Sequence, residues 1–223
     1  MEHRKDTYHI LPWDSKLFGY TVAKLTKRVS GKKLNAVLKR LKSLKITLVY
    51  WFVDPHDDNA NTEAKIHDGI LVDKKVTYVI DHIKYKKIAG DDNSVHSYRK
   101  HLSQELVSLA LQSGIHSRFF IDRNFVHGEY KKLYTIWIKK SISHKIAFDV
   151  IVYIDEYDSM KGFMSLESKG NNGSIGLLAV DKKSRGKSIG KTLVKKAFVI
   201  FDKRRYKKVF VTTQGNNTIA CQF

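Results

Sequence analysis

Residues 185–192, RGKSIGKT, combine two glycines with lysine, serine and threonine side chains that can bind phosphate groups. They follow an apolar run at 175–180, as the phosphate-binding loop of a nucleoside triphosphatase would. Such a loop needs a glycine, four residues and then Gly-Lys-Ser or Gly-Lys-Thr, so that its backbone wraps a phosphate. Counting back from Gly190, the required glycine falls on Arg185, so the spacing argues against a nucleoside triphosphatase.

The residues around this loop predict the elements that must position it. The run at 175–180, IGLLAV, is apolar on both faces and predicts a central strand. A helix from about 188 would bury one apolar stripe, made of Ile189, Leu193, Ala197 and Phe201. We expect a hairpin before the loop, and a strand and a last helix after it, at 146–154, 161–168, 207–213 and 216–223. This order predicts an α/β (α+β) fold, with a mixed central sheet flanked by helices.

A loop between a central strand and a helix start can hold phosphate without a P-loop. The first amides of the helix have no partner within it, and the helix dipole favours negative charge there. Gly186 and Gly190 allow a ligand to approach the backbone closely, and Arg185 and Lys187 add positive charge. The segment therefore predicts a pyrophosphate site at a helix N-terminus.

The N-terminal half repeats the same elements more loosely. We expect a polar, turn-prone linker at 86–95, and hence domains at 1–90 and 96–223. Before the linker, strands are expected at 20–25, 45–53, 70–73 and 75–83, and helices at 32–44 and 59–69. After it, two helices are expected at 98–113 and 127–141.

The stretch LLAVDKKSRGKSIGKTLV resembles the acetyl-coenzyme A signature of the GCN5-related N-acetyltransferases, the GNAT superfamily. Its pattern is Arg/Gln-x-x-Gly-x-Gly/Ala, and Arg185, Ser188 and Gly190 occupy the three marked positions, with serine in place of the first glycine. The resemblance implies a GNAT-type fold that binds acetyl-coenzyme A (acetyl-CoA) and no metal. The implied cofactor-binding residues are Leu178, Ala179, Val180, Arg185, Gly186, Lys187, Ser188, Ile189, Gly190, Lys191 and Asn217.

Further segments, in order along almost the whole chain, narrow the resemblance. They are LPWDSKLFGY, SGIHSRFFIDRNF, LYTIWIKKSI and VTTQGNNTIA, and with the loop they resemble the dTDP-4-amino-4,6-dideoxygalactose (dTDP-fucosamine) N-acetyltransferases. This resemblance implies that residues 1–90 are a partial copy of the GNAT fold. It also implies acetyl transfer to the 4-amino group of a nucleotide-linked sugar, for the synthesis of bacterial surface polysaccharide.

The same resemblance implies direct transfer, without an acyl-enzyme. The backbone amide near Val180 would polarise the thioester carbonyl, and Asp73 would take the amine's proton through water. Asp73 could equally be a turn residue before two lysines. Ser117, Arg118 and Phe119 lie where the nucleotide sugar would bind; Arg118 could grip its diphosphate or form a surface ion pair.

The family pattern continues, after the last helix begins, with a tyrosine that protonates the departing thiolate. Its expected position lies one residue beyond Phe223, so the resemblance implies that the second domain is cut short at its C-terminus.

Composition limits the partners and the compartment. A formal charge of +19 and the absence of recognisable nucleic-acid motifs favour a lysine-rich surface or an anionic small-molecule site. The single cysteine, Cys221, and the lack of a long apolar run predict a cytoplasmic protein without a membrane segment. We do not expect nucleic acid as a partner, and a homodimer is a candidate assembly. Two alternative functions stay open: a GNAT enzyme acting on a protein or small-molecule amine, and a basic nucleic-acid-binding module without catalysis.

Overall fold

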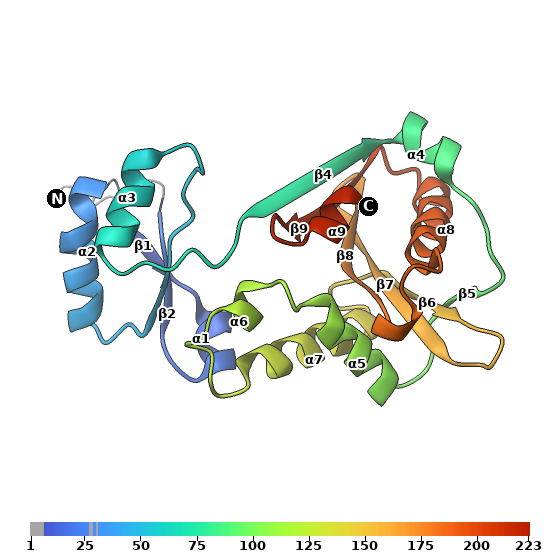
Figure 1. Cartoon of the computed structure of the whole chain (residues 1–223), viewed down its shortest axis with the longest axis horizontal. Helices are drawn as coiled ribbons and strands as arrows, with labels where there is room; N and C mark the ends of the chain where they lie inside the picture. Colours follow the sequence, from blue (N-terminus) through green and yellow to red (C-terminus); the bar gives the residue numbers. More distant parts are fainter. Residues whose placement is uncertain (1–6, 27–28, 30) are drawn as a thin grey trace. The chain divides into compact units, whose positions relative to one another are not determined.

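The computed structural model describes residues 7–26, 29 and 31–223. The chain divides into two compact units, residues 1–72 and residues 73–223 (Figure 1). Each unit has its own sheet.

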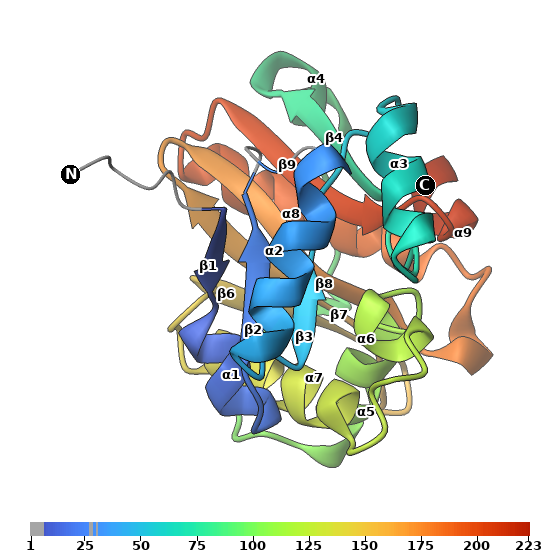
Figure 2. The same cartoon turned by 90° about the vertical axis from the view of Figure 1, so that its left-hand side faces the viewer.

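The first unit is a three-stranded sheet with a helix on one face (Figure 2). Strand β2 is central, antiparallel to β1 and parallel to β3. The apolar side of α2 packs on the sheet because Leu34 and Leu41 meet Ala23 and Leu25 in one buried cluster. The elements are β1 (Tyr8–Ile10), α1 (Pro12–Phe18), β2 (Val22–Leu25), α2 (Gly31–Ser43), β3 (Leu48–Tyr50) and α3 (Asp58–Ile66).

The second unit is a six-stranded mixed sheet in the order β4-β9-β8-β7-β6-β5. Neighbouring strands are antiparallel except β8 and β9, which are parallel and are connected through α8. Its strands are β4 (Lys75–Asp81), β5 (Val95–Ser97), β6 (Asp149–Ile154), β7 (Met160–Lys169), β8 (Asn172–Val180) and β9 (Lys208–Gln214). Its helices are α4 (His82–Ile88), α5 (Gln104–Ser113), α6 (Arg118–Ile121), α7 (Glu129–Ile142), α8 (Ile189–Lys203) and α9 (Thr218–Gln222).

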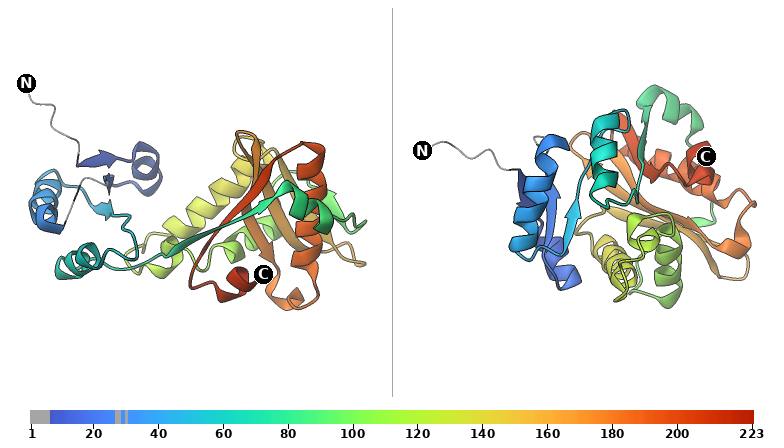
Figure 3. Two further views of the ribbon diagram at one scale, coloured as in Figure 1. Left: turned by 90° about the horizontal axis from the view of Figure 1, so that it is seen from above. Right: turned by 60° about the vertical axis from the view of Figure 1, so that its left-hand side comes forward.

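Helices cover this sheet on both faces (Figures 1 and 3). On one face, Leu193 and Phe201 of α8 pack against Leu166 of β7. On the other, Leu106 of α5 and Ile138 of α7 share a buried cluster with side chains of β6, β7 and β8. Successive side chains of a strand point to opposite faces, so this arrangement assigns each strand residue to the α8 face or to the α5 and α7 face.

The division between the units differs from the boundary expected at 90–96. Strand β4 pairs with β9 along its full length, so it belongs to the second sheet. The expected linker at 86–95 consists instead of the end of α4, a short connection and the start of β5. Residues 70–73, expected as a strand, form no strand and carry the chain from one unit to the other.

The order of elements from β6 to α9 agrees with the sequence prediction, with boundaries that shift by a few residues. The strand expected at 45–53 is shorter, because only Leu48–Tyr50 pairs with β2. Helix α6 was not predicted, because four residues are too few to show a helical period. Among the described residues, no helix is long and apolar enough to cross a membrane.

Candidate functional site

The loop from β8 to α8 holds two residues in the left-handed region of backbone conformation. Gly186 has φ +80° and Ser188, the residue before α8, has φ +60°. For residues other than glycine this backbone conformation costs free energy, because the Cβ atom comes close to the following carbonyl oxygen. The serine in the expected glycine position therefore keeps the glycine-like backbone turn, and its side chain makes no capping hydrogen bond to the helix.

The first turn of α8 leaves amides available to a ligand. Within the part of the chain that the structure describes, the N–H groups of Ile189 and Gly190 donate no hydrogen bond. Arg185, Lys187 and Lys191 are exposed around them and supply positive charge. This combination of helix amides and exposed cationic side chains fits the phosphates of a nucleotide-like ligand.

The side chains of the predicted cofactor residues divide into exposed and buried groups. Arg185 Nε donates a hydrogen bond of 3.2 Å to the carbonyl oxygen of Val180, so the guanidinium lies back over the end of β8. Ile189 and Ala179 are buried in the core on opposite faces of the sheet, and Leu178 packs beside the α8 cluster. Ile189 and Ala179 can therefore contact a ligand through their backbone only.

Strands β8 and β9 pair at their N-terminal ends and then separate. Their register covers three positions, Gly173 to Ile175 against Val209 to Val211. Beyond Ile175, β8 remains paired with β7 up to Val180, whereas β9 remains paired with β4 up to Gln214. The opening between them is an interruption in the centre of the sheet, at the strand ends that lead into the loop and into α9.

The backbone of β8 presents amides to this opening. The N–H of Asp181 donates to the carbonyl oxygen of Lys161 of β7, and that of Leu177 donates to Ser165 Oγ of the same strand. Alternate amides of a strand point to opposite edges, so the N–H groups of Leu178 and Val180 point toward β9. These two N–H groups can donate hydrogen bonds to an extended ligand, as they would to a neighbouring strand.

A second group of polar side chains lies around the start of the second unit. Asp73 is half-buried, and its Oδ1 atom is buried without a hydrogen-bond partner among the described residues. Burial raises the pKa of the Asp73 carboxyl, while the charges of Lys75 and Arg118 pull it down. Burial also raises the pKa of Tyr134. The neighbouring Ser117 and Arg118 lower this pKa, and the charge of Asp73 raises it further. The structure thus brings together Asp73, Ser117 and Arg118, which lie far apart in the sequence.

Two other predicted site residues have structural contacts of their own. The Phe119 ring is buried against Phe125 and Trp137, and the Arg118 guanidinium lies 4.3 Å from its centre. Asn217 caps α9, because its Oδ1 accepts from the amide of Ala220 at 3.2 Å. Phe119 is therefore a support for Arg118, and Asn217 positions the helix at the open end of β9.

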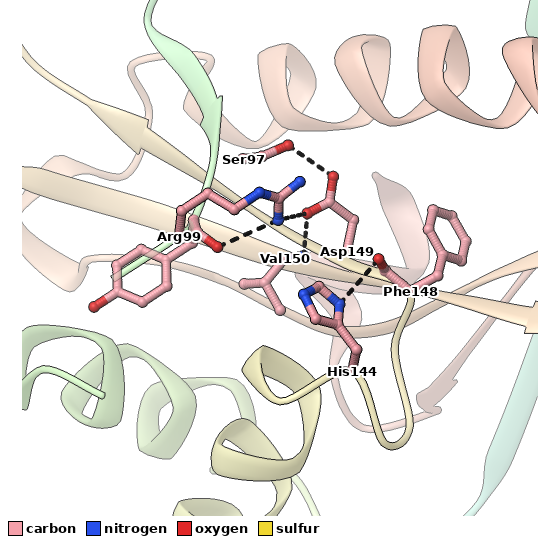
Figure 4. Close-up of polar contacts among 7 residues, drawn as sticks. Ser97, Arg99, His144, Phe148, Asp149 and Val150 are labelled. Atoms are coloured by element: carbon pink, nitrogen blue, oxygen red, sulfur yellow. Dashed lines mark hydrogen bonds and ion pairs between the residues drawn. The ribbon is translucent and has the colours of Figure 1, made fainter. Parts of the chain in front are cut away.

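A further polar cluster lies at the opposite end of the sheet (Figure 4). Asp149, which is buried, accepts hydrogen bonds from Ser97 Oγ at 2.7 Å, from Arg99 at 2.9 Å and from the amide of Val150 at 2.8 Å. These bonds join β5 to β6, so the cluster holds the sheet edge together.

No group of three His, Cys, Asp or Glu side chains among the described residues is arranged to hold a metal ion.

Comparison with known proteins supports the reading of the loop. The model of the acetyltransferase (GNAT) family matches residues 116–223, which contain α7, the opening between β8 and β9, and the loop. No curated protein matches the sequence.

Solved structures share the fold at low sequence identity. A functionally unknown conserved protein from Staphylococcus epidermidis has 10% identity and a TM-score of 0.66, over 100% of this chain and 86% of its own. A GCN5-related N-acetyltransferase from Sphaerobacter thermophilus has 10% identity and a TM-score of 0.58, over 94% and 68%. A tandem GNAT protein from the clavulanic acid biosynthesis pathway has 12% identity and a TM-score of 0.50, over 90% and 70%. Residues 116–223, which contain the loop and the interrupted part of the sheet, are thus an acetyltransferase domain of the GNAT family.

Proposed function

We propose that the enzyme transfers acetyl from acetyl-CoA to the 4-amino group of a nucleotide-linked amino-dideoxy sugar, such as a dTDP-4-amino-4,6-dideoxyhexose. The observation that supports acetyl-CoA as the donor is that the loop before α8 lies next to the opening between β8 and β9. The acceptor half rests on the sequence resemblance and on the group formed by Asp73, Ser117 and Arg118.

The loop would bind the pyrophosphate of acetyl-CoA. The amides of Gly186, Ser188 and Gly190 would donate to phosphate oxygens, and the hydroxyl of Ser188 would add a further bond. Arg185, Lys187 and Lys191 would neutralise charge. The pantetheine arm would then run along β8 and use the backbone at Leu178 and Val180, whose amides face the opening.

The transfer itself would be direct. A neutral amine attacks the thioester carbonyl, the C–N bond forms, and the C–S bond breaks with its electron pair on sulfur. The amide of Val180 would stabilise the negative charge that develops on the carbonyl oxygen. Asp73 would receive the amine's proton through water, because burial already favours its protonated form.

Arg118 would hold the diphosphate of the sugar nucleotide. Its guanidinium is positioned by the ring of Phe119, and Ser117 lies beside it in the connection from α5 to α6. We also propose a cytoplasmic location, which a chain with a single cysteine favours, and a homodimer as a candidate assembly.

The donor half is tested by thermal unfolding with and without acetyl-CoA. We expect acetyl-CoA to raise the melting temperature, and Arg185→Ala to remove most of this effect through a roughly tenfold weaker Kd. Lys203→Ala is the matched control, because it removes a positive charge from the exposed far end of the same helix. A chain that acetyl-CoA does not stabilise would contradict the donor assignment.

The acceptor half is tested by thiol release from acetyl-CoA with a panel of amines. We expect dTDP-4-amino-4,6-dideoxygalactose to be the best substrate, and spermidine and a lysine peptide to be poor ones. If the enzyme acetylates only the peptide or only spermidine, the acceptor is a protein amine or a polyamine and not a nucleotide sugar. Salt-dependent binding of DNA without binding of acetyl-CoA would favour the basic module without catalysis.

A further inference from the structure

Glu167 of β7 is a half-buried carboxylate that the proposed reaction does not use. It lies directly opposite Ser174 of β8, and Leu166 beside it lies opposite Ile175. Ile175 is the last residue of β8 that pairs with β9. Glu167 therefore stands at the level where the two strands begin to separate.

The side chain of Glu167 points to the face of the sheet that α5 and α7 cover. Its neighbour Leu166 is buried in the cluster with α8 on the other face, and successive side chains alternate. Arg118 and Tyr134 also belong to the helical segment from α5 to α7. An acceptor that is held by this segment would approach the opening from the same face as Glu167.

Gly176 leaves room for the Glu167 carboxylate beside the backbone of β8. A Cβ atom on Gly176 would lie 2.0 Å from Glu167 Oε1 and 2.7 Å from Ser165 Oγ. The register between β7 and β8 shifts here, with the extra residue on β8, and Ser165 Oγ accepts from the amide of Leu177. The irregularity thus brings a carboxylate onto the backbone of the strand at the entrance to the opening.

Burial raises the pKa of Glu167, against the lowering effect of the Lys169 charge. A carboxylate with a raised pKa is a better proton acceptor than an exposed one. Among the described residues, none forms a hydrogen bond or an ion pair with this carboxylate.

We propose that Glu167 takes the proton of the acceptor amine during acetyl transfer. The inference rests on the proposed acetyl transfer, but it assigns the proton to Glu167 in place of Asp73. It also places the thioester carbonyl at the amide of Leu178 in place of Val180, two residues nearer to Glu167 along β8. Leu178 lies two residues along β8 from Gly176, roughly 7 Å at 3.3 Å per residue, so the amine or one water can span the interval. The amine gives one proton to Glu167 as C–N forms and C–S breaks, and solvent carries that proton to the thiolate.

Asp73 then has a different place in the site. The amide of Gly215, just past β9, donates to Lys74, which puts Asp73 beyond the far end of β9. Gly215 lies four residues along the chain from Val211, where β8 and β9 part, or roughly 13 Å at about 3.3 Å per residue. Asp73 would be an outer carboxylate beside Arg118, and Glu167 the inner one beside the reacting atoms.

The test compares Glu167→Gln, Asp73→Asn and the unaltered chain in thiol release, with whichever panel amine the unaltered chain acetylates. We expect Glu167→Gln to lower kcat about 100-fold and to abolish the acid limb of the kcat–pH profile, with the Kd of acetyl-CoA unchanged. Gly176→Ala should give a similar loss by displacing the carboxylate. Glu105→Gln, an exposed glutamate of α5, is the matched control.

Each outcome decides the matter. An unchanged kcat and pH profile in Glu167→Gln overturns the inference, and so does a loss of acetyl-CoA binding or of folding in that variant, since the role would then be structural. If only Asp73→Asn loses the acid limb of the kcat–pH profile, Asp73 and not Glu167 accepts the proton of the amine. If the unaltered chain transfers no acetyl to any amine, the proposed function fails, and the inference fails with it.

Discussion

Ser188 shows how one residue can serve both backbone and ligand in the loop before α8. Its left-handed conformation turns the chain into the helix, while its side chain makes no capping bond. A glycine would make the same turn at lower conformational cost in the folded state, but it would offer no hydroxyl.

We predict that Ser188→Ala weakens acetyl-CoA binding about tenfold, because one hydrogen bond to a charged phosphate is lost. The melting temperature without ligand should stay within about 2 °C of the unaltered value, since the hydroxyl caps no helix amide and has no hydrogen-bond partner among the described residues. Calorimetric titration and thermal unfolding measure the two effects. Equal affinity in both proteins would show that the hydroxyl does not reach the phosphates.

A second residue-scale prediction concerns Gly114 at the end of α5. A Cβ atom there would lie 2.1 Å from Cζ of the Tyr134 ring, which is almost fully buried and cannot move freely. Gly114→Ala should therefore destabilise the protein by about 1–3 kcal/mol, as overpacking does. Because the ring neighbours Ser117 and Arg118, KM for the acceptor should rise while the Kd of acetyl-CoA stays constant. A variant with unchanged stability and unchanged KM would contradict the close packing of Tyr134 against Gly114.

At the scale of elements, α4 and α8 are joined by a polar contact with a defined pH dependence. The ring of His82 lies 2.5 Å from Asp202, and this hydrogen bond lowers the pKa of Asp202, against a smaller opposing effect of burial. A carboxyl with a lowered folded-state pKa contributes stability above its unfolded pKa of about 4, and that contribution is lost as the pH falls through the folded-state pKa.

We therefore expect Asp202→Asn to lower the melting temperature at pH 6 and to leave it nearly unchanged near pH 2. Thermal unfolding across this range checks the expectation. Asp158→Asn, an exposed carboxyl in the turn from β6 to β7, is a suitable control. A constant difference between the two proteins at every pH would mean that the ionised form of Asp202 is not what stabilises the contact.

Elements were easier to predict from the sequence than their partners. The stripe of Ile189, Leu193 and Phe201 repeats with a helical period, so the sequence predicted α8, and the apolar run before it predicted β8. The pairing of β4 with β9 was not predicted, because a strand's alternation identifies its faces and not its neighbour. Glu167 was missed for the same reason: only the register places it beside Gly176 and the opening.

At the scale of the whole molecule, the formal charge of +19 has a kinetic consequence. A strongly positive protein attracts a ligand that carries several phosphate charges, and salt screens this attraction. We predict that the association rate of acetyl-CoA falls roughly tenfold between about 50 and 500 mM salt, while the dissociation rate changes much less. Stopped-flow binding measures both rates. If only the dissociation rate responds to salt, the charge acts through local contacts in the loop and not through the field of the whole protein.

The interruption between β8 and β9 leaves a dynamic signature in the middle of the sheet. The amides of Leu178 and Val180 belong to a central strand, yet among the strands that the structure describes none pairs with them on the β9 side. Hydrogen exchange at these two amides should be fast, while the alternate amides of Leu177 and Asp181, which donate to Ser165 and Lys161, should exchange slowly. A bound donor would erase this odd-and-even pattern along one strand, so the occupancy of the site can be read amide by amide without any chemical turnover.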